Sequence, residues 1–124
     1  MNRGKKMSTR ATYRFIPKYK GFKPEITLYV HHDGYPEGAA NYLREVSCAE
    51  DFIRNNPRAE LTLNHEVHGD TEYRYNIIEL GRRIHAYKRE GYGNDAAWVQ
   101  FFDGSFDEFI EQNLPAIEYL KVTA

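Results

Sequence analysis

The sequence is poor in cysteine and in long apolar runs. Cys48 is the only cysteine in 124 residues, so no disulfide can form within the chain and no cysteine-based zinc site can be built. We therefore expect a reducing, cytoplasmic environment. No apolar run approaches the roughly 20 residues that a membrane span requires, and no signal-peptide core is present, so we expect no membrane association.

Acidic residues are missing from the first part of the chain. Residues 1–23 carry eight of the 17 Lys and Arg and none of the 18 Asp and Glu, although the net charge of the whole chain is only −1. This uneven distribution of charge indicates binding to a partner or self-association, and it carries no information about the fold. A homo-oligomer is therefore one alternative. Because the body is acidic, we do not expect a broad contact with nucleic acid.

The composition is that of one globular domain. The chain is 41% hydrophobic and 28% charged, and its length suits a single domain. We expect residues 1–8 to form a flexible basic leader and residues 9–124 to form a single α+β domain. Ten of the aromatic residues are tyrosines, which suit half-exposed sheet faces and contact surfaces as well as cores.

The spacing of apolar residues predicts the order of strands and helices. The expected strands are 9–16, 25–32, 72–80, 83–90 and 96–102. A helix is expected over 37–55, with a break near Ser47, and a second helix after a capping box of Ser105 and Glu108. Residues 58–71 remain undecided between strand, short helix and loop. The short links favour hairpins and predict an α+β fold, an antiparallel sheet of about five strands with two helices packed on one face.

The stretch YVHHDGYPEG, residues 29–38, joins a strand end, a turn and a helix start. The turn accounts for Gly34, because glycine permits a positive φ, and for Pro36, because proline fixes its own φ. It does not account for the polar side chains, which lie between a strand end and a helix N-terminus, a place suited to a small ligand or an anion. With their expected neighbours, the predicted ligand-binding residues are Arg10, His31, His32, Asp33, Tyr35, Glu37, His68, Asp70 and Tyr73.

Four of the five histidines fall in two clusters, HHD at 31–33 and HEVHGD at 65–70. If the two segments meet, they could form a metal site or an acid–base pair. The H-E-x-H spacing differs from the H-E-x-x-H of zinc proteases, and no nucleophile motif accompanies it. We therefore assign no metal, no cofactor and no catalytic residue. A small hydrolase or nuclease that uses these His and Asp residues, with or without a metal, is kept as the alternative.

Two expected neighbouring strands carry aromatic and basic residues on single faces. Such faces can stack nucleotide rings, or they can pack across strands on a solvated surface, and we expect the second. The residues are Tyr73, Tyr75, Ile77 and Glu79 on one strand and Arg83, His85, Tyr87 and Arg89 on the next.

Four stretches resemble small proteins of unassigned function from bacteriophages, prophages and mobile elements: MSTRATYRF, VHHDGYPEGAANYL, HEVHGDTEYRY and AYKRE. The likeness covers most of residues 7–102 and includes an S-T-R opening and a strand ending in H-x-D-G-Y-P-x-G. It implies a phage-type accessory protein in the host cytoplasm that acts by binding. The implied partner is a host protein, such as a defence enzyme to be inhibited, or a small nucleotide signal to be sequestered. An assembly accessory protein is a further alternative.

Overall fold

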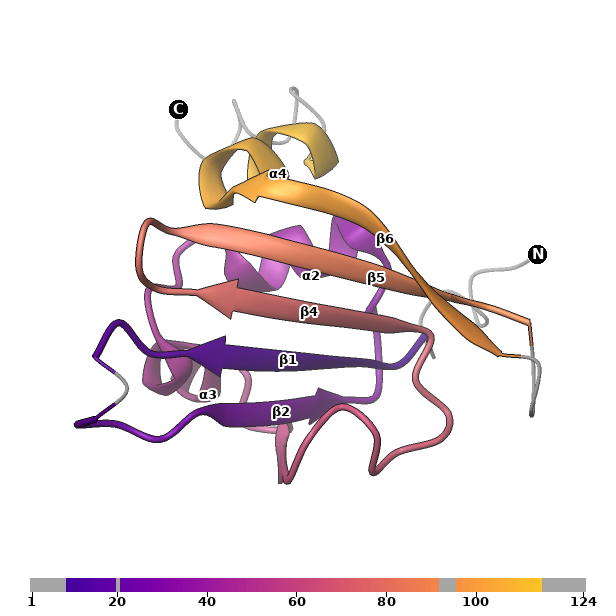
Figure 1. Ribbon diagram of the computed structural model, residues 1–124, viewed down its shortest axis with the longest axis horizontal. Helices are drawn as coiled ribbons and strands as arrows, with labels where there is room; N and C mark the ends of the chain where they lie inside the picture. Colours follow the sequence, from indigo (N-terminus) through magenta and orange to yellow (C-terminus); the bar gives the residue numbers. More distant parts are fainter. Residues whose placement is uncertain (1–8, 20, 92–95, 115–124) are drawn as a thin grey trace.

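The computed structural model describes residues 9–19, 21–91 and 96–114, which form one sheet with helices on one face (Figure 1). The strands are β1 (Ala11–Ile16), β2 (Ile26–Val30), β3 (Glu60–Thr62), β4 (Tyr73–Ile78), β5 (Arg83–Glu90) and β6 (Ala97–Ser105). The helices are α2 (Pro36–Leu43), α3 (Ala49–Asn55) and α4 (Phe106–Asn113). The predicted α+β class is confirmed. The expected leader, residues 1–8, lies outside the described residues.

The six strands are ordered β3-β2-β1-β4-β5-β6, so β1 and β4 occupy the centre of the sheet. Every neighbouring pair is antiparallel except β1 and β4, which are parallel. The short links do form hairpins, as expected, between β1 and β2 and between β4 and β5. The parallel pair was not predicted, because it depends on a long crossover through α2, α3 and β3 rather than on any local turn.

The segment 37–55 forms two helices, so the described chain has three helices where the sequence predicted two. The break lets both Leu43 of α2 and Phe52 of α3 be fully buried against the sheet. At the other predicted start, Ser105 and Glu108 form the expected capping box of α4. No helix in the described ranges is long and apolar enough to cross a membrane.

The core between the sheet and the helices is rich in tyrosine. Tyr13 of β1 and Tyr75 of β4 are fully buried and stack, with ring centroids 5.1 Å apart and planes 16° apart. They are direct partners in the parallel register, in which Ala11 lies beside Tyr73. The expectation that the Tyr73–Tyr75 face is solvated is therefore wrong for Tyr75, because the helices cover this face.

The turn before α2 is set by close backbone contacts. Asp33 has the positive φ, 57°, that the sequence predicted for Gly34. Gly34 is needed for space instead, because a Cβ there would lie 2.6 Å from the Cβ of Ala11. Its N–H donates to the carbonyl of Thr9 at 2.9 Å, and its carbonyl accepts from the hydroxyl of Tyr75 at 2.6 Å. The turn is therefore fixed to both central strands.

We expect Gly34→Ala to lower the free energy of unfolding by about 1–3 kcal/mol, because the added methyl group meets backbone and a buried alanine that cannot move away. Urea unfolding measures this. Gly69→Ala is the matched control, since a Cβ there meets nothing within 4 Å. Equal stability of the two variants would contradict the proposed role of Gly34.

Candidate functional site

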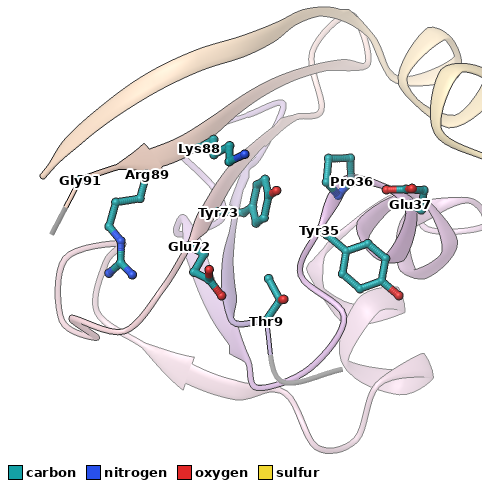
Figure 2. Close-up of a pocket in the computed structure, with 9 residues that line it drawn as sticks. All are labelled: Thr9, Tyr35, Pro36, Glu37, Glu72, Tyr73, Lys88, Arg89 and Gly91. Carbon is teal, nitrogen blue, oxygen red and sulfur yellow. The ribbon is translucent and has the colours of Figure 1, made fainter. Parts of the chain in front are cut away.

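A cavity of about 410 Å³ opens between the start of α2 and the strands β4 and β5 (Figure 2). We call it the β4 cavity. It is lined by Thr9, Tyr35, Pro36, Glu37, Glu72, Tyr73, Lys88, Arg89 and Gly91. Three of the nine predicted ligand-binding residues are brought together here: Tyr35 and Glu37 from the turn into α2, and Tyr73 from the start of β4.

The ring of Tyr73 has one face on which no described aromatic residue stacks. Deeper in the sheet, Tyr13 stacks on the β1 side of Tyr75, but the register places only Ala11 beside Tyr73. The ring neighbours of Tyr73 are Tyr75 along the strand, 6.2 Å away, and Phe101 of β6, 5.9 Å away at 79°. Ala11 is fully buried beneath the Gly34 turn, so the half-buried Tyr73 ring meets the cavity between that turn and Lys88 of β5.

The charged side chains of the β4 cavity are balanced in number. Two carboxylates, Glu37 and Glu72, and two cations, Lys88 and Arg89, line it, and the guanidinium of Arg89 donates to the carbonyl of Gly69 at 3.0 Å. Within the described part of the chain, Glu37, Glu72 and Lys88 make no ion pair. Burial raises the pKa of Tyr73, and the nearby charges of Glu72 and Glu37 raise it further. The cavity therefore combines an aromatic face with hydrogen-bonding groups of both signs.

Glu37 approaches the cavity from the first turn of α2. Figure 2 shows its carboxylate and the hydroxyl of Tyr73 turned toward each other across the space beside Pro36. An acid in the first turn complements the positive end of a helix. The helix therefore attracts an anion less than the sequence predicted, and this side of the cavity is better suited to a hydrogen-bond donor.

The HHD motif lines a second cavity, of about 550 Å³. His31, His32 and Asp33 lie there with the residues that follow α3, and His31 Nε2 lies 2.6 Å from a carboxylate oxygen of Glu60. Burial and then the charge of Asp33 raise the pKa of Tyr42 to about 12. The structure thus places His31 and His32 apart from the β4 cavity, whereas Asp33 connects the two cavities, since its carboxylate accepts from the hydroxyl of Tyr35 at 3.4 Å.

The other three predicted residues gather around Tyr29 on the helix-free face of the sheet. His68 stacks on the Tyr29 ring with centroids 3.7 Å apart, and the Tyr29 hydroxyl donates to both carboxylate oxygens of Asp70 at 2.8 and 2.9 Å. Arg10 Nε lies 3.0 Å from Asp70, and His31 contacts the ring edge-on at 4.6 Å. The two histidine clusters therefore meet at a tyrosine, and these contacts hold the chain after β3 against the sheet.

His65 anchors the same segment from a buried position. It is 8% exposed, and its Nδ1 and Nε2 lie 2.6 Å from Thr12 Oγ1 and 2.8 Å from Asn76 Oδ1. Because the amide oxygen only accepts, the network assigns the proton to Nε2, and Nδ1 accepts from the threonine hydroxyl. Burial lowers the pKa of His65, against the opposing effect of the Asn76 hydrogen bond. The imidazole is therefore a neutral structural group.

Neither histidine cluster is arranged as a metal site. In residues 9–19, 21–91 and 96–114, no group of three or more His, Cys, Asp or Glu side chains is placed to hold a metal ion. The alternative of a hydrolase that uses these residues would have to rest on acid–base chemistry at the second cavity or on residues that the structure does not describe.

Three charged residues of the β4 cavity, Glu72, Lys88 and Arg89, were not among the predicted ligand-binding residues, and Arg89 was named only as part of a strand face. Lys88 extends the buried face of β5 formed by Ile84 and Ala86, and a lysine at the end of an otherwise apolar face was a usable signal. Glu72 gave no comparable signal, because the sequence placed it as the first residue of the strand 72–80, whereas β4 begins at Tyr73.

Comparison of the chain with protein-family models, curated proteins and solved structures finds no match. The resemblance to phage and mobile-element proteins therefore stays a prediction.

We expect acidification below about pH 6.5 to destabilise the protein through His65. The pKa of His65 is lowered in the folded state, so the unfolded chain takes up this proton first. The stability present at higher pH is then lost as the pH falls from the unfolded toward the folded pKa, by at most about 1.4 kcal/mol per pH unit. Urea unfolding of the wild type and His65→Gln across this range measures the difference. Equal slopes for the two proteins would contradict this role of His65.

Proposed function

We propose that the protein acts by binding, and that it holds a mononucleotide in the β4 cavity with the base against Tyr73. The observation that carries this proposal is the half-buried ring of Tyr73, which lines the cavity together with charged groups of both signs. Stacking of a base on an aromatic side chain contributes about 1–3 kcal/mol.

The charges of the cavity favour a ligand with little net charge. Lys88 has no ion pair in the described residues and can neutralise one phosphate. Glu37 and Glu72 would repel a chain of phosphates, so a monophosphate or a phosphodiester fits better than a triphosphate. The volume, about 410 Å³, lies within the range of about 300–1,000 Å³ usual for small-molecule pockets.

The biological role that we propose is the sequestration of a nucleotide signal in the host cell. It is supported by the resemblance to phage-type accessory proteins together with the polar and aromatic lining of the cavity. Inhibition of a host protein is the competing form of the same proposal, and it would not require the cavity to hold a nucleotide.

We expect at least one of the four ribonucleoside 5′-monophosphates to bind with one molecule per chain in isothermal titration calorimetry. Tyr73→Ala should weaken this binding by about 1–3 kcal/mol through the lost stacking. Tyr87→Ala is the matched control, because it makes the same change on the helix-free side of β5 and should leave affinity unchanged. Lys88→Gln should weaken binding and reduce its dependence on salt.

Two results would overturn the proposal. One is the absence of binding for all four monophosphates at millimolar concentration, with the protein folded by circular dichroism. The other is equal loss of affinity in Tyr73→Ala and Tyr87→Ala, which would place the nucleotide outside the β4 cavity or reflect a general loss of structure.

A further inference from the structure

We infer that the β4 cavity selects guanine over adenine and that the carboxylate of Glu37 reads the base. This inference rests on the proposed function, since it concerns which nucleotide the cavity takes. The base would stack on Tyr73 and present its Watson–Crick edge to the first turn of α2, where the carboxylate lies (Figure 2).

The chemistry of the two purines differs at this edge. Guanine presents the N1–H and an N2 amino hydrogen side by side, and both oxygens of one carboxylate can accept from this pair. Adenine presents one amino group and the unprotonated N1, whose lone pair faces and repels a carboxylate. A carboxylate at this position therefore attracts guanine and repels adenine. The two effects together separate the affinities for the two bases more than attraction of guanine alone would.

The position of Glu37 distinguishes it from the other acid of the cavity. Glu37 comes from α2, on the wall opposite Tyr73, so it can meet the outer edge of a ring stacked there. Glu72 directly precedes Tyr73 in the chain, and Figure 2 shows its carboxylate directed toward Thr9. In the described part of the chain Glu37 makes no ion pair, so its oxygens are available to a ligand.

The test is titration calorimetry of the full chain with GMP, IMP and AMP in one buffer near pH 7. We expect GMP to bind about 10- to 100-fold more tightly than AMP, with IMP between them because it keeps N1–H and lacks the amino group. Glu37→Gln should reduce the preference for GMP over AMP at least about tenfold, because the amide offers a donor where the carboxylate offered a second acceptor. Glu72→Gln removes the same charge from the same cavity and should keep the preference.

The outcomes separate this inference from the proposal that it rests on. Binding of AMP as tight as that of GMP overturns guanine selection and leaves nucleotide binding standing. A preference for GMP that survives in Glu37→Gln overturns the role of Glu37. If none of the three nucleotides binds to the folded protein, the proposed function itself is overturned.

Discussion

The hydrogen bond from the Tyr75 hydroxyl to the carbonyl of Gly34, 2.6 Å long, joins the centre of the sheet to the turn before α2. A buried phenol without an acceptor costs about 1–3 kcal/mol, so the position of β4 and the shape of the turn depend on each other. The same parallel register sets Tyr13 against Tyr75 and leaves Ala11 beside Tyr73. The same register therefore fills the core with Tyr13 and Tyr75 and places the ring of Tyr73, one step toward the rim, at the wall of the β4 cavity.

The wall of the cavity is held by contacts on the other side of the sheet. The chain between β3 and β4 is fixed by His65, and the Arg89 guanidinium donates to the carbonyl of Gly69 at 3.0 Å. The N–H of Arg89 then donates to the carbonyl of Glu72 at 2.9 Å, directly before Tyr73. Anything that loosens this segment therefore also loosens the ring on which a ligand would stack. The position of Tyr73 therefore depends on the contacts of this segment through the backbone rather than through shared side chains.

Local signals in the sequence were sufficient to predict most strands and helices, but they were not sufficient to predict which strands pair. The strand 83–90 was located to the residue, and the helix start at Ser105 was read from its capping box, because both depend on neighbouring residues. The parallel pairing of β1 with β4 depends on contacts between Tyr13 and Tyr75, which are far apart in the chain. The conformation of Asp33 was likewise hidden, because contact between Gly34 and another strand, rather than turn chemistry, requires glycine there.

The predicted site divides in the structure because the polar motif runs past the end of β2 into the turn. Side chains two residues apart on a strand share a face, but β2 ends at Val30 and the chain turns at Asp33, whose φ is 57°. Tyr29 and His31 meet on the helix-free face, whereas Asp33 turns toward Tyr42 on the other side. Polar residues that are contiguous at the end of a strand can therefore lie in different parts of the structure. Of the motif, only Tyr35, Pro36 and Glu37 line the β4 cavity. Tyr73 lines it from β4, which is distant in the sequence.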